Sequence, residues 1–222
     1  MSAVTPLFAT VRPLPPPERS AVLEQLAEHC RFSRSDGSHR THQSTGHATL
    51  DERLPGGGWP LGALIEVMSA QSGIGELSLL LPTLCALARE GRQIACIAPP
   101  WLPNPPALAQ QGLPLSQLLL IQPAQPQDAL WAMEQCLRCD AFGAVLGWCP
   151  DIDARSVRRL QLAAEAGGGS GWLYRPLQAL EQSSPAALRL RLQATPAGLE
   201  VQLRKVRGGA PGAVVVHPAA AA

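Results

Sequence analysis

Residues 69–81 read SAQSGIGELSLLL, and the setting of this stretch decides the fold. The apolar run LIEVM at 64–68 precedes it and predicts a buried strand, while residues 76–90 repeat leucines at helical spacing. A glycine-containing loop between a strand and the start of a helix is where many α/β proteins hold phosphate groups. The sequence therefore predicts an α/β protein with a phosphate-type loop, and the question is whether that loop works.

Further apolar runs alternate with amphipathic segments after this loop. We expect strands at 93–98, 118–121, 142–147 and 171–174, and helices at 126–139 and 154–166. This alternation predicts a parallel sheet flanked by helices. Residues 187–194 and 198–205 instead alternate apolar and polar side chains, which predicts a C-terminal antiparallel β-hairpin.

The chain divides into three regions by composition. Residues 1–48 form an N-terminal extension with a Pro-rich start, a short helix at 18–31 and a polar linker. Residues 49–217 form the α/β domain, and residues 218–222 form a disordered tail. With 46% hydrophobic residues among 222, the chain has enough apolar material for one sizeable core.

Charge and hydropathy exclude several classes of protein. A net charge of +1 provides no large field to attract nucleic acid or an anionic membrane. No uncharged apolar stretch is long enough to cross a membrane, and the first residues lack the pattern of a secretory signal. We therefore expect a cytoplasmic protein without membrane contact.

The segment before the loop carries a family resemblance. LDERLPGGGWPLG at 50–62, followed by the strand LIEVM, resembles the segment that leads into the phosphate loop of RecA-type recombinases. The resemblance implies a RecA-like domain from residue 49 to about residue 207. More narrowly, the sequence resembles the ImuA family of bacterial RecA-like proteins associated with translesion DNA synthesis.

Three parts of the RecA-type ATPase machinery are missing from the positions that this resemblance assigns. A working loop needs a Lys and a hydroxyl after its glycines. Neither is present in the degenerate loop Ser72, Gly73, Ile74, Gly75 and Glu76. The metal-positioning Asp corresponds to Gly147, and no carboxylate follows the strand at 93–98. We expect no catalytic residue, no cofactor and no metal, since Cys136 and Cys139 also lack a second pair to complete a zinc site.

Two sets of residues are candidates for binding contacts. The basic residues, which are either a solvated surface or a weak and salt-dependent DNA contact, are Arg155, Arg158, Arg159, Arg204, Lys205 and Arg207. Tryptophans are enriched in interface hot spots, so Trp59, Trp101 and Trp131 are either core residues or anchors for a partner.

The resemblance to ImuA implies a non-catalytic accessory protein of SOS-induced translesion synthesis. Its implied partners are an ImuB-type Y-family-like protein and an error-prone replicative-type polymerase, with RecA as a further candidate. Two alternatives stay open: a SulA-like cell-division inhibitor, and an ATPase with an unorthodox loop. SulA-type chains are shorter, and the lead GGWP at 57–60 together with the N-terminal extension favours ImuA.

Overall fold

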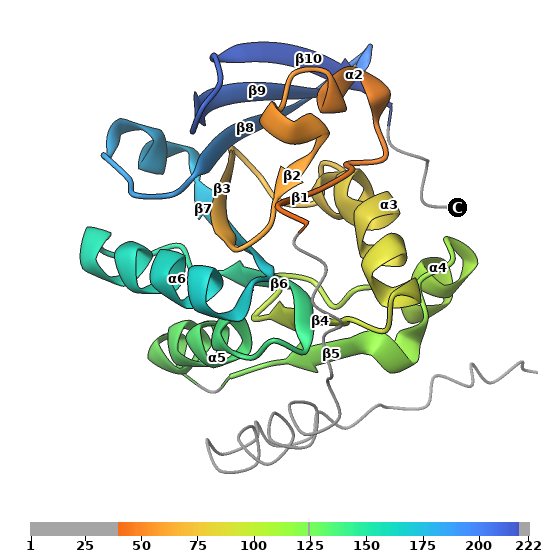
Figure 1. Ribbon diagram of the computed structural model, residues 1–222, viewed down its shortest axis with the longest axis vertical. Coiled ribbons are helices and arrows are strands. Elements are labelled where there is room, and N and C mark those ends of the chain that lie inside the picture. Colours follow the sequence, from red (N-terminus) through yellow and green to blue (C-terminus); the bar gives the residue numbers. More distant parts are fainter. Residues whose placement is uncertain (1–39, 124, 218–222) are drawn as a thin grey trace, which may run out of the picture.

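The computed structural model describes residues 40–123 and 125–217 and has a mixed α/β fold built on one large sheet (Figure 1). Across this sheet the eight described strands run in the order β10-β9-β8-β3-β7-β6-β4-β5. The strands from β8 to β5 are parallel, whereas β9 and β10 are antiparallel to their neighbours. In chain order they are β3 Ala63–Ser69, β4 Gln93–Ile97, β5 Leu118–Ile121, β6 Phe142–Trp148, β7 Ser170–Pro176, β8 Leu188–Thr195, β9 Gly198–Val206 and β10 Gly212–Val216.

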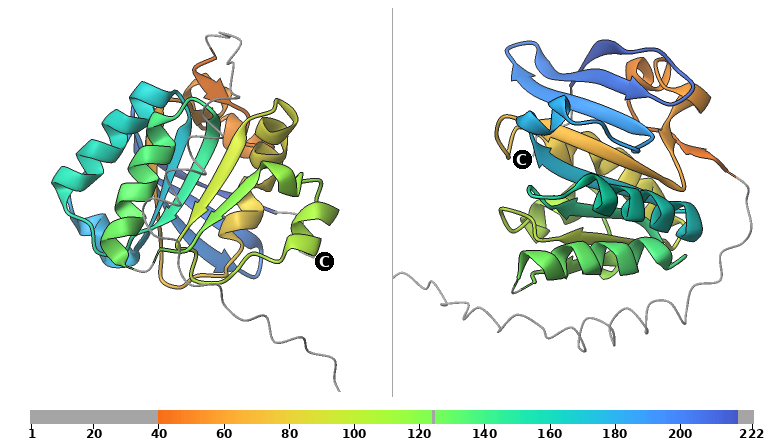
Figure 2. Two further views of the ribbon diagram at one scale, coloured as in Figure 1. Left: turned by 90° about the horizontal axis from the view of Figure 1, so that it is seen from below. Right: turned by 90° about the vertical axis from the view of Figure 1, so that its left-hand side faces the viewer.

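Helices cover both faces of the parallel part of the sheet (Figure 2). Helix α3, Glu76–Arg89, lies on one face. Helices α5, Pro126–Arg138, and α6, Ala154–Gly167, pack together on the other. Each face has its own apolar core, which explains why the central strands β3, β6 and β7 are buried almost throughout. The predicted parallel sheet flanked by helices is therefore confirmed.

The predicted C-terminal hairpin is present as β8 and β9, and β10 extends it by a strand that the sequence analysis missed. One face of this antiparallel part packs into the core through Leu199, Val201 and Leu203 of β9. The other face carries exposed side chains such as Gln193 and Val215. No described α-helix lies across that face (Figure 2), although the Ala179 and Ser184 carbonyls contact Arg189 and Lys205 at one end of it.

Residues 40–48 belong to the predicted polar linker, yet they lie against the domain. β1, His42–Gln43, pairs with β2, Trp59–Pro60, and α2, Ala48–Asp51, and the 3-10 turn η1, Pro55–Gly57, lie between them. Thr45 is fully buried. The Asp51 carboxylate accepts the Thr45 amide at 2.8 Å and the Ser44 hydroxyl at 2.7 Å. Polar composition suggested a mobile linker, but here the polar groups bond to one another. The domain boundaries themselves remain a prediction.

The proline-dense connector after β4 also contains structure that was not predicted. Pro105–Gln110 forms the short helix α4, which begins where the Asn104 side chain accepts the Ala107 amide, and Leu115–Gln117 forms the 3-10 turn η2. The predicted helix at 18–31 and the predicted tail at 218–222 lie outside the described residues. No helix within 40–123 and 125–217 has both the length and the apolar character needed to cross a membrane.

Candidate functional site

The loop between β3 and α3 is closed by a carboxylate from its own chain. Gly73 and Gly75 take positive φ angles of 84° and 102°, which turn the backbone amides of the loop inward. The buried carboxylate of Glu76 accepts the Gly73 amide at 2.7 Å and the Ile74 amide at 2.8 Å. The amides that a phosphate would need are therefore bonded to Glu76, and its negative charge repels an incoming phosphate.

The predicted metal position, Gly147, does not face this loop. A Cβ atom built on Gly147 would lie 2.4 Å from the sulfur of Met133 in α5, so a larger residue there would require the Met133 side chain to move. The next residue of β6, Trp148, points to the opposite face of the sheet and borders the loop. The residue of β6 that faces the loop is thus Trp148, whose indole ring cannot bind a metal ion as a carboxylate does.

Trp148 stacks on Tyr174 of the neighbouring strand β7, and sequence reasoning identified neither residue. Their ring centroids are 4.4 Å apart and their planes differ by 7°. The Tyr174 hydroxyl is buried and has no hydrogen-bond partner among the described residues. Burial, and then the nearby charges of Glu76 and Cys96, raise the pKa of Tyr174 well above its usual value, so the phenol stays protonated. Stacked rings and a neutral phenol leave no ligand set for Mg²⁺.

An open groove of about 560 Å³ adjoins this closed loop. Its walls are residues 73–78 of the loop and α3, residues 99–103 of the connector after β4, and the β8–β9 turn. Two large apolar side chains of the connector project into solvent here, since Trp101 is 74% exposed and Leu102 is 68% exposed. We call these two residues, with the groove, the apolar rim.

The three candidate tryptophans occupy different environments. Trp59 is fully buried, meets Trp172 edge to face, and donates its indole N–H to the Thr83 hydroxyl at 3.1 Å. It is a core residue with no surface to offer a partner. Trp131 is half-buried and packs on the α5–α6 core, whereas Trp101 is exposed. Residue type alone does not separate these cases.

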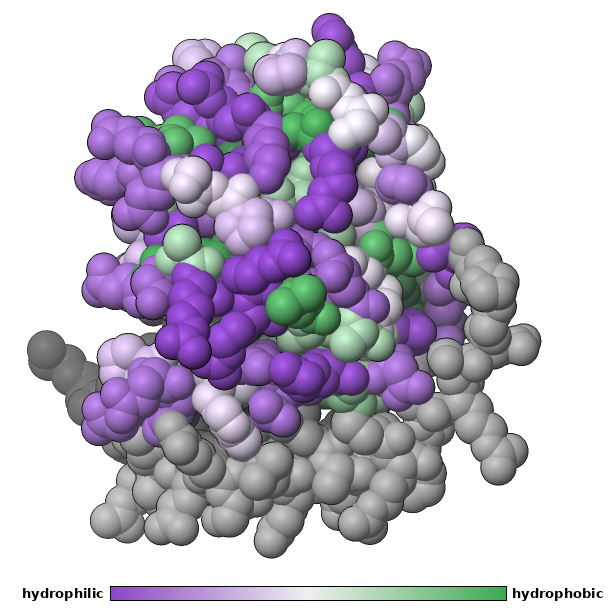
Figure 3. Space-filling view, turned by 60° about the vertical axis from the view of Figure 1, so that its left-hand side comes forward, coloured by the Kyte–Doolittle hydropathy of each residue, from purple (hydrophilic) through white to green (hydrophobic). Residues whose placement is uncertain are grey.

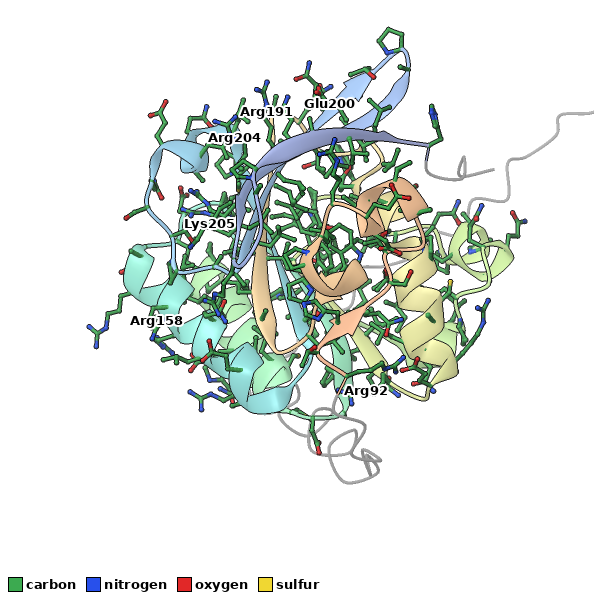
Figure 4. The ribbon with its side chains drawn as sticks, turned by 45° about the horizontal axis from the view of Figure 1, so that its top comes forward. Arg92, Arg158, Arg191, Glu200, Arg204 and Lys205 are labelled. Carbon is green, nitrogen blue, oxygen red and sulfur yellow. The ribbon has the colours of Figure 1, made fainter. Side chains whose placement is uncertain are left out.

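The six basic candidates fall on two separate elements. Arg155, Arg158 and Arg159 lie on α6, where Arg159 pairs with Glu134 of α5. Arg204 and Lys205 lie on β9, apart from Arg158 in Figure 4, and Arg207 follows β9 in the sequence. The Lys205 ammonium donates to the Ser184 carbonyl at 2.7 Å. Burial lowers the pKa of Lys205, and the charges of Arg207 and Arg189 lower it further. The six candidates therefore come from two separate elements.

A buried charge cluster that sequence reasoning missed anchors the segment between β7 and β8. Glu66 of β3 is fully buried and accepts Arg175 of β7 and Arg189 of β8, each at 2.8 Å. Arg189 also donates to the backbone carbonyls of Ala179 and Gln182, in and just after the 3-10 turn η3, Leu177–Glu181. Arg175 donates to the Ile152 carbonyl in the segment between β6 and α6. The segment between β7 and β8 is therefore fixed to the sheet.

Comparison with known proteins identifies the family. The model of the family "Cell division inhibitor SulA" matches residues 62–171. SulA of Yersinia enterocolitica is 30% identical over 131 residues, which are 58% of this chain and 78% of that protein. The chain belongs to the SulA family. SulA of Yersinia pestis is 31% identical over 114 residues, covering 51% of this chain and 68% of that protein.

A SulA structure from Pseudomonas aeruginosa is also similar, at 26% identity and a TM-score of 0.43, covering 50% of this chain and 97% of that chain. The interpretation as an ImuA-type translesion protein is therefore wrong, and with it the ImuB-type, polymerase and RecA partners. That interpretation relied on the length of the chain. The SulA match covers 78% of the relative but 58% of this chain, so length does not argue against the SulA family. The family is named for inhibition and not for an enzymatic reaction, which agrees with the expected lack of catalysis.

Proposed function

We propose that this protein is a cell-division inhibitor that binds the tubulin-like division protein FtsZ through protein–protein contact and without turnover. Membership of the SulA family carries the proposal, because proteins of that family bind FtsZ. The closed loop supports a mechanism without nucleotide, since Glu76 already holds the amides of Gly73 and Ile74. The same bonds argue against the ATPase alternative.

We also propose that the fold is RecA-like in its finer topology. The support is the central position of β3, the strand that leads into the phosphate-type loop, with α3 following directly. The antiparallel strands β9 and β10 added at one edge agree with the expected C-terminal hairpin. In this proposal the ancestral site persists as a scaffold whose chemistry has been replaced.

We place the FtsZ contact at the apolar rim. Trp101 and Leu102 are the two most exposed large apolar side chains of the described residues. Prolines on both sides, at Pro99, Pro100 and Pro103, restrict their backbone, so less conformational entropy is lost when a partner binds. The one acidic residue in the groove, Glu76, is engaged within its own loop, which leaves the rim without a free charge.

The cellular test is overexpression in undamaged bacteria that lack their own SulA. We expect the cells to elongate into filaments, because an inhibitor that acts by binding needs no DNA-damage signal once it is abundant. Normal division in cells shown to contain the folded protein would remove the proposal.

The biochemical test uses purified FtsZ and a matched pair of leucine variants. Leu102→Ser at the rim should weaken binding to FtsZ about tenfold or more, as expected for a hot-spot residue. Leu162→Ser on α6 is the control, because Leu162 is also exposed, at 46%, but lies far from the rim in sequence and on the other face of the sheet. Binding is measured by inhibition of FtsZ GTP hydrolysis and polymer sedimentation. Equal effects of the two variants would move the contact elsewhere while leaving the function standing.

A further inference from the structure

The C-terminal strands carry a positive charge that the rest of the chain does not share. Residues 187–217 contain five of the 18 Lys and Arg residues but one of the 17 Asp and Glu residues. This segment therefore has a net charge of +4, and the remaining residues together have −3. Only Arg189 is neutralised within the described structure, through its ion pair with Glu66.

A β-bulge gathers this charge on one face. Leu203 of β9 faces the core, so Arg204 points to the opposite, outer face. The register between β8 and β9 shifts at Arg204, so the next residue, Lys205, is paired with Arg189. Arg189 lies on the outer face of β8, from which it reaches Glu66, so Lys205 lies on that face too. Consecutive residues of a regular strand alternate between faces, but the bulge places both cations on the outer face.

Arg191 of β8 completes the group. It lies directly across from Gln202, so Arg204 is its diagonal neighbour at about 7–8 Å. Figure 4 shows Arg191, Arg204 and Glu200 together at this ribbon, with Lys205 on the same strand and Arg158 apart on α6. We call the outer surface around Arg191, Gln193, Gln202 and Arg204 the basic sheet face. The side of the molecule shown in Figure 3 is mostly hydrophilic.

We propose that the basic sheet face binds an extended acidic segment of a partner protein, with carboxylates at alternating residues. Side chains on one side of an extended chain repeat every 6.6–6.8 Å or so, which is close to the spacing of about 7–8 Å expected between diagonal neighbours such as Arg191 and Arg204. An arginine can bind a carboxylate through two parallel N–H donors, so two such pairs set both spacing and direction. Gln193 and Gln202 lie on the same face, and the Gln193 Oε1 atom accepts from Arg191 at 3.0 Å. The amide N–H groups of Gln193 and the side chain of Gln202 are then the groups that pair with the backbone of the segment.

The composition of the face favours a protein over a nucleic acid. Sheets that bind single strands present aromatic rings on which bases stack. The described outward residues of β8, β9 and β10 are arginine, lysine, glutamine, glutamate, threonine, glycine, alanine and valine, without an aromatic ring. Glu200 sits among them and would repel a phosphate backbone, whereas a peptide can direct a neutral residue at that position.

This contact is independent of the proposed FtsZ contact. The apolar rim borders the loop on the α3 side of the sheet, while the basic sheet face looks outward on the side of α5 and α6. One copy of the chain could therefore hold both partners.

The test measures binding of a fluorescein-labelled decapeptide of alternating Glu and Ser to the full chain at low salt. We expect the peptide to bind and Arg191→Glu combined with Arg204→Glu to lower its affinity about tenfold or more. The control Arg158→Glu replaces one arginine by glutamate on α6, outside the basic sheet face. It should lower the affinity for the peptide less than about threefold. Glu200→Gln should raise the affinity. Circular dichroism checks that each variant is folded, and all four positions lie at the surface.

Three results would overturn the proposal. The first is that the peptide does not bind the wild-type chain. The second is that the control variant loses as much affinity as the double variant. The third is that a decamer of thymidine nucleotides binds the same face as tightly as the peptide, which would assign the face to nucleic acid. Loss of FtsZ binding in the Leu102→Ser variant has no bearing on these outcomes, so the two proposals fail separately.

Discussion

Two buried glutamates stand ten residues apart in the strand–loop–helix unit around β3, and they are neutralised in different ways. Glu66 is paired with Arg175 and Arg189, which lie 109 and 123 residues further along the chain. Glu76 is bonded to the amides of Gly73 and Ile74, three and two residues before it. One carboxylate holds distant strands together, and the other shapes a single loop.

The difference shows which part of this strand–loop–helix unit contributes most to stability. At Glu66, removal of the carboxylate would leave two cations inside the protein, a much larger penalty than the loss of a hydrogen bond. At Glu76 the donors are neutral amides near the surface, which water or an anion can satisfy. Substitutions in the β7–β3–β8 region should therefore lower stability strongly, whereas substitutions in the loop between β3 and α3 should lower it less.

The largest expected effect is that of Glu66→Gln. It leaves Arg175 and Arg189 buried without a counter-charge and should lower the free energy of unfolding by about 3–5 kcal/mol. The matched control is Glu134→Gln, because Glu134 also pairs with two arginines, but Arg138 and Arg159 are 55% and 50% exposed. Hydration of these arginines should limit the loss to about 1 kcal/mol. Urea unfolding measures both, and similar losses would mean that burial of the cluster is not what makes it costly.

A smaller effect is expected from Glu76→Ala. Loss of the acceptor for two amides should lower the free energy of unfolding by about 1–3 kcal/mol. Sulfate should then raise the melting temperature of the variant more than that of the wild type, since the released amides can bind an anion. The exposed Glu52→Ala serves as control for non-specific salt effects. An identical response to sulfate in variant and wild type would show that Glu76 does not occupy an anion-binding loop.

The smallest effect at neutral pH is expected from Tyr174→Phe. It removes a buried hydroxyl without a partner among the described residues, so the free energy of unfolding at pH 7 should change by less than about 1 kcal/mol. The pKa of Tyr174 is raised in the folded state, so the unfolded chain releases this proton first as the pH rises past about 10. The wild type should therefore lose stability with increasing pH above that value, and the variant should lose less. Denaturant unfolding between pH 8 and pH 11 measures the slopes, and parallel curves would contradict the argument.

Local pattern was sufficient for most of the fold. The strands at β3, β4, β5, β6 and β7, the helices α3, α5 and α6, and the β8–β9 hairpin all follow from periodicity within a few neighbouring residues. Short or irregular elements were missed, namely α4 within its prolines and β10 after its glycines. The partner prediction was wrong because it depended on the resemblance of residues 50–62 to another family, and a resemblance at the level of fold does not determine function.

By itself, the sequence determined that this is a sheet flanked by helices and that its phosphate-type loop lacks the lysine and hydroxyl of a nucleotide site. Those features depend on residue type and spacing within single segments. The tertiary structure alone decided that Trp148 rather than Gly147 faces the loop, that Trp59 is buried while Trp101 is exposed, and that Glu66 meets two arginines. Each of these depends on which strands become neighbours and on the phase in which their side chains alternate. A single sequence does not show which residues more than a hundred positions apart will meet, as Glu66 meets Arg175 and Arg189.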